Sequence, residues 1–98
     1  MVSQRLAAKV RDDFSAAAVE DVLQRLDTLS LPLAEKQSLE RIQAAVTLLA
    51  AGDRKKFDYY ARLAETDWRD VLVFSGLGDE DWPARLDLEL GPKRRGSA

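Results

Sequence analysis

The sequence predicts an all-α fold, in which about five short helices form one compact bundle around a buried central helix at about residues 32–51. Along that central segment, apolar residues recur at helical steps of three and four: Leu39, Ile42, Val46 and Leu49. The second half of the segment, residues 44–51, contains no charged residue. Because a surface helix keeps a polar face, a segment that is apolar all round is expected to be covered on most sides.

Punctuating residues set the expected ends of the central helix. Pro32 lies near its start, where a missing N–H costs nothing, and Gly52 follows its end, where a left-handed residue is favoured. Glu40 lies in the amphipathic first half and is expected to face water. We expect Val46 and Leu49 to be almost fully buried, because they end the apolar stripe inside the uncharged run.

Before the central helix, the pattern predicts two helices with a break between them. Ser3 suits the cap of a first helix in which Leu6 and Val10 form an i, i+4 pair. Ser15 suits the cap of a second helix, whose apolar stripe consists of Val19, Val22, Leu23, Leu26 and Leu29.

A single helix from Ser3 to Leu29 is the alternative, because no Gly or Pro interrupts that stretch. At 100° per residue, however, Leu6 and Val22 lie about 160° apart, so one straight helix could not bury both on one surface. We therefore expect the chain to break or bend at residues 12–15.

After the central helix, Asp53 is the natural cap of a helix that runs to about Glu65. Thr66 or Asp67 then caps a short helix that Gly76 ends. The last helix follows, with Pro83 in its first turn, and Gly91–Pro92 stops it. Three leucines in this last element also alternate, as in a strand: Leu86, Leu88 and Leu90. A strand there would have no second strand to pair with.

The chain length of 98 residues indicates a single domain. We expect this helical domain to occupy residues 1–92, with a disordered basic tail at residues 93–98. The start of the chain lacks the apolar run of a secretory signal, and no stretch approaches the ~20 apolar residues of a membrane span. The expected location is therefore the cytoplasm, without membrane contact.

The composition excludes several kinds of chemistry. The sequence contains neither Cys nor His, so thiol catalysis, disulfides, imidazole acid–base catalysis and the usual transition-metal sites are all ruled out. Asp79, Glu80 and Asp81 lack the spacing and the glycine of an EF-hand loop, and charge at a helix start explains them. We therefore expect no enzyme activity, no catalytic residue, no cofactor and no metal.

A basic cluster, Arg54, Lys55 and Lys56, lies in the first turn of a helix, where cations oppose the macrodipole. These residues are candidates for contact with an anion or phosphate, and together with the basic tail they support an alternative function as a nucleic-acid-associated or regulatory protein. The alternative is that these cations only stabilise the fold, by lying against the C-terminal carbonyls of the preceding helix. Residues 65–90 carry eight acidic and two basic groups, which makes nucleic acid an unfavoured partner.

The apolar residues are numerous for a monomer of this size, which favours binding of a protein partner, with a homodimer expected. The candidate interface residues are Tyr59, Leu63, Leu6, Val10, Trp68 and Trp82. Two alternatives stay open: the N-terminal segment could fold back to cap the core within one chain, and the two tryptophans could anchor short helices onto the core.

Two runs, ERIQAAVTLLAAGD at Glu40–Asp53 and YARLAETDWRDVL at Tyr60–Leu72, resemble a group of small bacterial all-helical proteins that has no established activity. The resemblance covers residues 40–72 and implies a compact helical domain and a bacterial source. It assigns no catalytic residue. The function expected from the sequence is a non-enzymatic module for protein–protein interaction or self-association.

Overall fold

A computed structural model describes residues 2–31 and 38–91 of the chain, and its fold is all-α, as predicted. Within these residues there is no β-strand, and the helices are α1 (Gln4–Asp13), α2 (Ala16–Asp27), α3 (Ser38–Ala50), α4 (Arg54–Ser75) and α5 (Trp82–Leu90). None of these helices combines the length and the apolar character that crossing a membrane requires. The predicted start of the central helix at Pro32 and the predicted tail at 93–98 lie outside the described residues.

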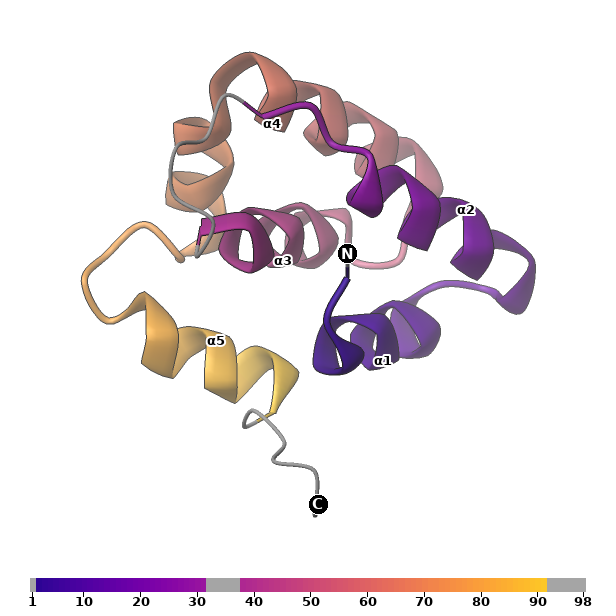
Figure 1. The fold of residues 1–98 in the computed structure, drawn as a ribbon, viewed down its shortest axis with the longest axis horizontal. Coiled ribbons are helices and arrows are strands. Elements are labelled where there is room, and N and C mark those ends of the chain that lie inside the picture. The colour runs from indigo at the N-terminus through magenta and orange to yellow at the C-terminus, as the bar shows by residue number, and fades with distance from the viewer. Residues whose placement is uncertain (1, 32–37, 92–98) are drawn as a thin grey trace.

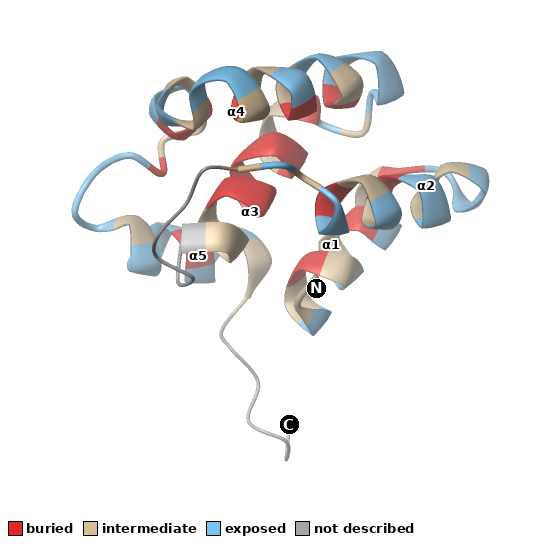
Figure 2. Ribbon diagram, turned by 45° about the horizontal axis from the view of Figure 1, so that its top comes forward, coloured by how far each residue is buried: buried red, intermediate tan, exposed pale blue. Residues whose placement is uncertain are grey.

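Helix α3 is the central element, as predicted. Figure 1 shows α4 arching over it, with α1 and α2 on one side and α5 below. Most of α3 is buried (Figure 2), and its fully buried residues are Ile42, Ala44, Ala45, Val46, Thr47 and Ala50. Two buried polar side chains find partners, because Gln43 Nε2 donates to Leu26 O at 3.1 Å and Thr47 Oγ1 donates to Gln43 O at 2.9 Å.

Two details of the α3 prediction are wrong. Leu49 is only half-buried, unlike Val46, because the apolar stripe turns out of the core near the end of the helix. Glu40, which was expected to face water, instead accepts hydrogen bonds from Arg5 of α1. Its neighbour Arg41 donates from Nε to Leu77 O at 2.8 Å, and its guanidinium lies 4.8 Å from the centre of the Trp82 ring.

The predicted break near the N-terminus is confirmed. Helix α1 ends at Asp13 and α2 begins at Ala16, so the single-helix alternative is wrong. The turn lets Leu6 and Val22 both reach the core, where neither has exposed surface. Phe14, between the two helices, packs edge-on against Phe57 of α4 with ring centres 5.8 Å apart.

Local capping chemistry explains the starts of α1 and α4. The Asp53 carboxylate accepts hydrogen bonds from Lys55 N at 2.9 Å and Lys56 N at 3.2 Å, as expected of an N-cap. Ser3 caps α1 by accepting from Leu6 N, but Ser15 makes no side-chain capping bond to α2.

The helix expected to end near Glu65 and the short helix expected after it form one element, α4, with a kink between them. Asp67 has non-helical backbone angles (φ −151°, ψ 87°), and its carboxylate accepts a hydrogen bond from Arg69 N at 3.2 Å. Asp67 therefore caps the second half of α4 from inside the helix. Gly76 ends α4 with a left-handed φ of 83°, as predicted.

The C-terminal element α5 is a helix, so the strand alternative for its alternating leucines is wrong. Pro83 lies in its first turn, where no backbone N–H is missed. One face of α5 buries Leu86, while Leu88 points away from the core and is 80% exposed.

Arg5 joins three helices, a role that the sequence analysis missed. Its guanidinium bonds both carboxylate oxygens of Glu40 in α3, at 2.9 and 3.0 Å. Its Nη1 also donates to Asp87 Oδ1 of α5 at 2.6 Å and to Gly91 O at 3.0 Å. Ser3 Oγ adds a bond to the same Glu40 carboxylate at 2.6 Å. Charged side chains of α1, α3 and α5 thus form one hydrogen-bonded network.

A second ion pair joins α2 to α4. Both Arg25 Nη atoms bond the Glu65 carboxylate at 2.9 Å, and Ser30 N donates to it at 2.8 Å. The hydrogen bonds from Arg25 lower the pKa of Glu65 from 4.5 to about 2, against the opposing effect of its partial burial.

This lowered pKa predicts a pH-dependent stability. A carboxylate whose pKa is lower in the folded state stabilises that state above its unfolded pKa, and the effect is lost as the pH falls towards the folded value. The loss in unfolding free energy caused by Glu65→Gln should therefore be about 1 kcal/mol near neutral pH, since the pair is partly exposed, and should shrink between about pH 5 and pH 2. Urea titrations of the variant and of the exposed control Glu89→Gln test it. A loss for Glu65→Gln that is constant across this range would contradict the assignment.

Candidate protein-interaction surface

The outer side of the first half of α4 carries a hollow of about 360 Å³ beside an exposed aromatic ring. We call this surface the Tyr59 face, and its lining residues are Lys55, Asp58, Tyr59, Arg62, Leu63 and Thr66. They recur at steps of three and four, so the helix itself brings them onto one side. Tyr59 and Leu63, two of the predicted interface residues, thus line the same surface, and their role in an interface stays a prediction.

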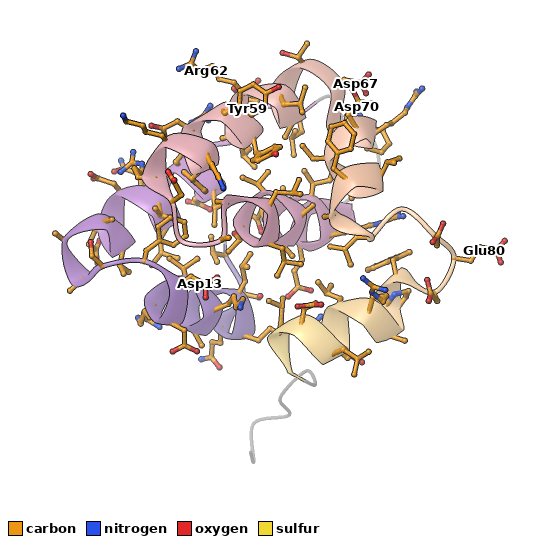
Figure 3. All side chains as sticks on the ribbon, turned by 180° about the vertical axis from the view of Figure 1, so that it is seen from behind. Asp13, Tyr59, Arg62, Asp67, Asp70 and Glu80 are labelled. Carbon is orange, nitrogen blue, oxygen red and sulfur yellow. The ribbon has the colours of Figure 1, made fainter. Side chains whose placement is uncertain are left out.

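Tyr59 projects from this face with 61% of its surface exposed, and Figure 3 shows it on the outer side of α4 together with Arg62. Its ring packs edge-on against Tyr60, with centres 5.1 Å apart, while Tyr60 itself packs against the core. The contact between the two rings restricts the orientation of Tyr59. An exposed aromatic ring that is already held in place loses little conformational freedom on binding.

The basic cluster that was predicted to contact an anion already binds carboxylates of the chain through Arg54 and through two backbone N–H groups. Arg54 Nε pairs with Asp58 at 3.2 Å and its Nη1 lies 3.6 Å from Asp21 of α2. The backbone N–H groups of Lys55 and Lys56, which an anion would need, already bond the Asp53 carboxylate. Lys55 and Lys56 remain exposed, but the N-terminus of α4 is occupied by a carboxylate of the chain itself.

The remaining predicted interface residues are drawn into the bundle. Leu6 and Val10 have no exposed surface and belong to the core, because the turn after α1 folds that helix back against α2 and α3. The structure thus agrees with the alternative in which the N-terminal segment caps the core within one chain. Trp68 and Trp82 are half-buried against the core, which fits their alternative role as anchors of short helical segments.

Two other hollows, of about 390 and 340 Å³, lie on the side formed by α1 and α2. Their linings include Leu23 and Val19, respectively, but neither contains an exposed large apolar residue. The Tyr59 face therefore differs from them in having an aromatic anchor.

Val73 and Phe74 were not among the predicted interface residues, yet they are 69% and 60% exposed. The sequence has four consecutive apolar residues here, and in the structure Val71 and Leu72 face the core and leave the next two outside.

Within the described residues, no group of three or more carboxylates is placed to hold a metal ion. The pKa of Glu65 is lowered mainly by its hydrogen bonds with Arg25. A general acid or base needs a pKa closer to neutrality than such a pair provides. The Glu65 carboxylate thus joins α2 to α4.

Comparison of the chain with protein-family models, with curated proteins and with solved structures found no match. The resemblance of residues 40–72 to a group of small bacterial proteins therefore stays a prediction.

Proposed function

We propose that this protein is a non-enzymatic interaction module that associates with a second copy of itself through the Tyr59 face. The observation that carries the proposal is the position of an oriented, exposed aromatic ring directly beside a hollow on the same helix. A surface that offers both a protruding group and a recess is suited to pair with its own copy.

Helix geometry supports a twofold arrangement. In a twofold pairing, the same patch is used by both copies and residue i of one meets residue j of the other. If two α4 helices cross antiparallel with the axis between residues 59 and 62, each Tyr59 meets the partner's Arg62. An arginine over a tyrosine ring adds cation–π attraction of about 0.5–1 kcal/mol. Asp58 keeps its ion pair with Arg54 in this arrangement.

The alternative function, binding of nucleic acid through Arg54, Lys55 and Lys56, receives less support. Arg54 is paired with two carboxylates, and the acidic block at residues 65–90 would repel phosphates. The expected cytoplasmic location and bacterial source are part of the proposal and rest on the sequence.

Light scattering across a concentration series tests self-association. We expect the mass to rise from the 10.9 kDa of one chain towards twice that value at about 10–100 µM. Because an aromatic anchor at the centre of an interface contributes about 2 kcal/mol or more and the twofold pairing contains two copies of Tyr59, Tyr59→Ala should weaken the association by at least about 30-fold. The matched control is Leu88→Ala, which removes an exposed apolar side chain from α5 and should leave the association unchanged. A mass of one chain at every concentration would contradict the proposal.

A further inference from the structure

The second half of α4 presents a separate apolar patch, formed by the adjacent residues Val73 and Phe74. Single exposed apolar residues are ordinary on protein surfaces, but two large ones side by side are a candidate contact point. The kink at Asp67 separates this half of α4 from the Tyr59 face. The patch is therefore a second surface.

Carboxylates precede and follow this patch along the chain. Asp70 lies three and four residues before Val73 and Phe74, so it flanks them on the helix, and Asp67 lies one turn earlier. The chain then turns back, because a Cβ added at Gly78 would lie 3.5 Å from Val73 Cα. Asp79 and Glu80 follow in the loop after this return, and Figure 3 shows Asp67 and Asp70 on the second half of α4 and Glu80 farther away, at the tip of the loop.

These carboxylates differ from two in the first half of α4. Asp58 and Glu65, in the first half of α4, form ion pairs with Arg54 and Arg25. In the described part of the chain, by contrast, the structure gives no ion pair to Asp67, Asp70, Asp79 or Glu80.

Two arginines lie in this part of the chain. Arg69 lies over the Trp68 ring at 5.5 Å, and one Nη atom of Arg85 would lie 2.8 Å from a Cβ added at Gly76. Within the described residues neither arginine forms an ion pair with the four carboxylates, which outnumber the two cations.

We propose that this surface, which we call the acidic patch (Asp67, Asp70, Val73, Phe74, Asp79 and Glu80), binds a basic amphipathic helix of a partner protein. The apolar side of such a helix covers Val73 and Phe74, and its Lys or Arg residues face the carboxylates. Charge complementarity selects this occupant, since a neutral or acidic segment would meet uncompensated repulsion or lose hydration without gain.

The proposal goes beyond self-association and does not depend on it. The acidic patch and the Tyr59 face lie on different sides of the kink, so one chain can use both surfaces. A second copy on the acidic patch is the competing occupant, and it would make self-association sensitive to Phe74.

A synthetic amphipathic peptide of about 15 residues, with Leu on one face and Lys on the other, is the probe. We expect binding to shift amide NMR signals of residues 67–81 in the full chain, and affinity to fall as salt rises from about 50 to 300 mM. Phe74→Ser and the double variant Asp67→Asn, Asp70→Asn should each weaken binding about tenfold or more. All three replaced side chains point outward or are partly exposed, so the fold should persist, and circular dichroism checks this.

Leu88→Ser is the matched control and should change the affinity less than twofold, because Leu88 is 80% exposed but lies on α5. A peptide with Glu in place of Lys should not bind. The proposal is overturned if the Lys peptide does not bind, if Leu88→Ser weakens it as much as Phe74→Ser, or if the Glu peptide binds equally. It is also overturned if Phe74→Ser abolishes self-association, since the occupant would then be a second copy. Loss of peptide binding in Tyr59→Ala would place the peptide on the Tyr59 face instead.

Discussion

Replacing Gly52 with alanine is expected to destabilise the fold by about 3 kcal/mol or more. Gly52 has a φ of 82°, a left-handed value that costs a residue with a side chain about 1–2 kcal/mol. The added Cβ would also overlap Asp13 O, at the corner between α1 and α2. Because that neighbour is backbone, two chain corners would have to move apart.

Gly76→Ala is the matched control for this prediction. Gly76 has nearly the same φ of 83°, in the left-handed region, and the atom nearest to a Cβ added there is the end of the flexible Arg85 side chain rather than backbone. It should therefore show mainly the backbone cost, and the difference between the two variants measures the close approach of Gly52 to Asp13. Urea unfolding followed by tryptophan fluorescence gives both values. Equal losses would show that the two corners do not touch in solution.

Phe57→Ala is expected to cost about 3–5 kcal/mol of unfolding free energy, by the usual sum of lost transfer energy and cavity formation. Phe57 is fully buried at the start of α4 and holds the ring of Phe14 edge-on. The variant therefore leaves a cavity where α4 meets the corner of α1 and α2. Leu88→Ala, on the exposed side of α5, should change stability by less than about 0.5 kcal/mol. A midpoint of chemical denaturation that is the same for Phe57→Ala and the wild type would place the core elsewhere.

The sequence predicted those features of the fold that depend on nearby residues. The uncharged run in α3, the caps at Ser3 and Asp53 and the left-handed Gly76 act within a few residues of their own positions. The break after α1 could be predicted for the same reason, since the angular drift of an apolar stripe is a property of one helix.

The features that the sequence did not predict depend on contacts between distant segments. Arg5 reaches Glu40 and Asp87 only because the fold brings α1 beside both α3 and α5. No spacing in the sequence predicts that arrangement. For the same reason Leu6 was assigned to an interface when it lies in the core.

The Tyr59 face was predicted in part, because periodicity places Tyr59 and Leu63 on one side of α4. The hollow beside them and the contact with the Tyr60 ring depend on rotamers, which a helical pattern does not specify. The acidic patch depends on the return of the chain at Gly78, which brings the loop back to the last turn of α4.

The most direct measurement of the proposed function is cross-linking through a single introduced cysteine. The sequence contains no Cys, so one variant carries one reactive thiol, and Arg62→Cys places it on the Tyr59 face. If α4 pairs with its copy about a twofold axis between residues 59 and 62, a short bifunctional maleimide should join two Arg62→Cys chains. Leu88→Cys, on α5, should stay unlinked at the same concentration. Equal cross-linking of both variants, or none of Arg62→Cys, would contradict association through the Tyr59 face.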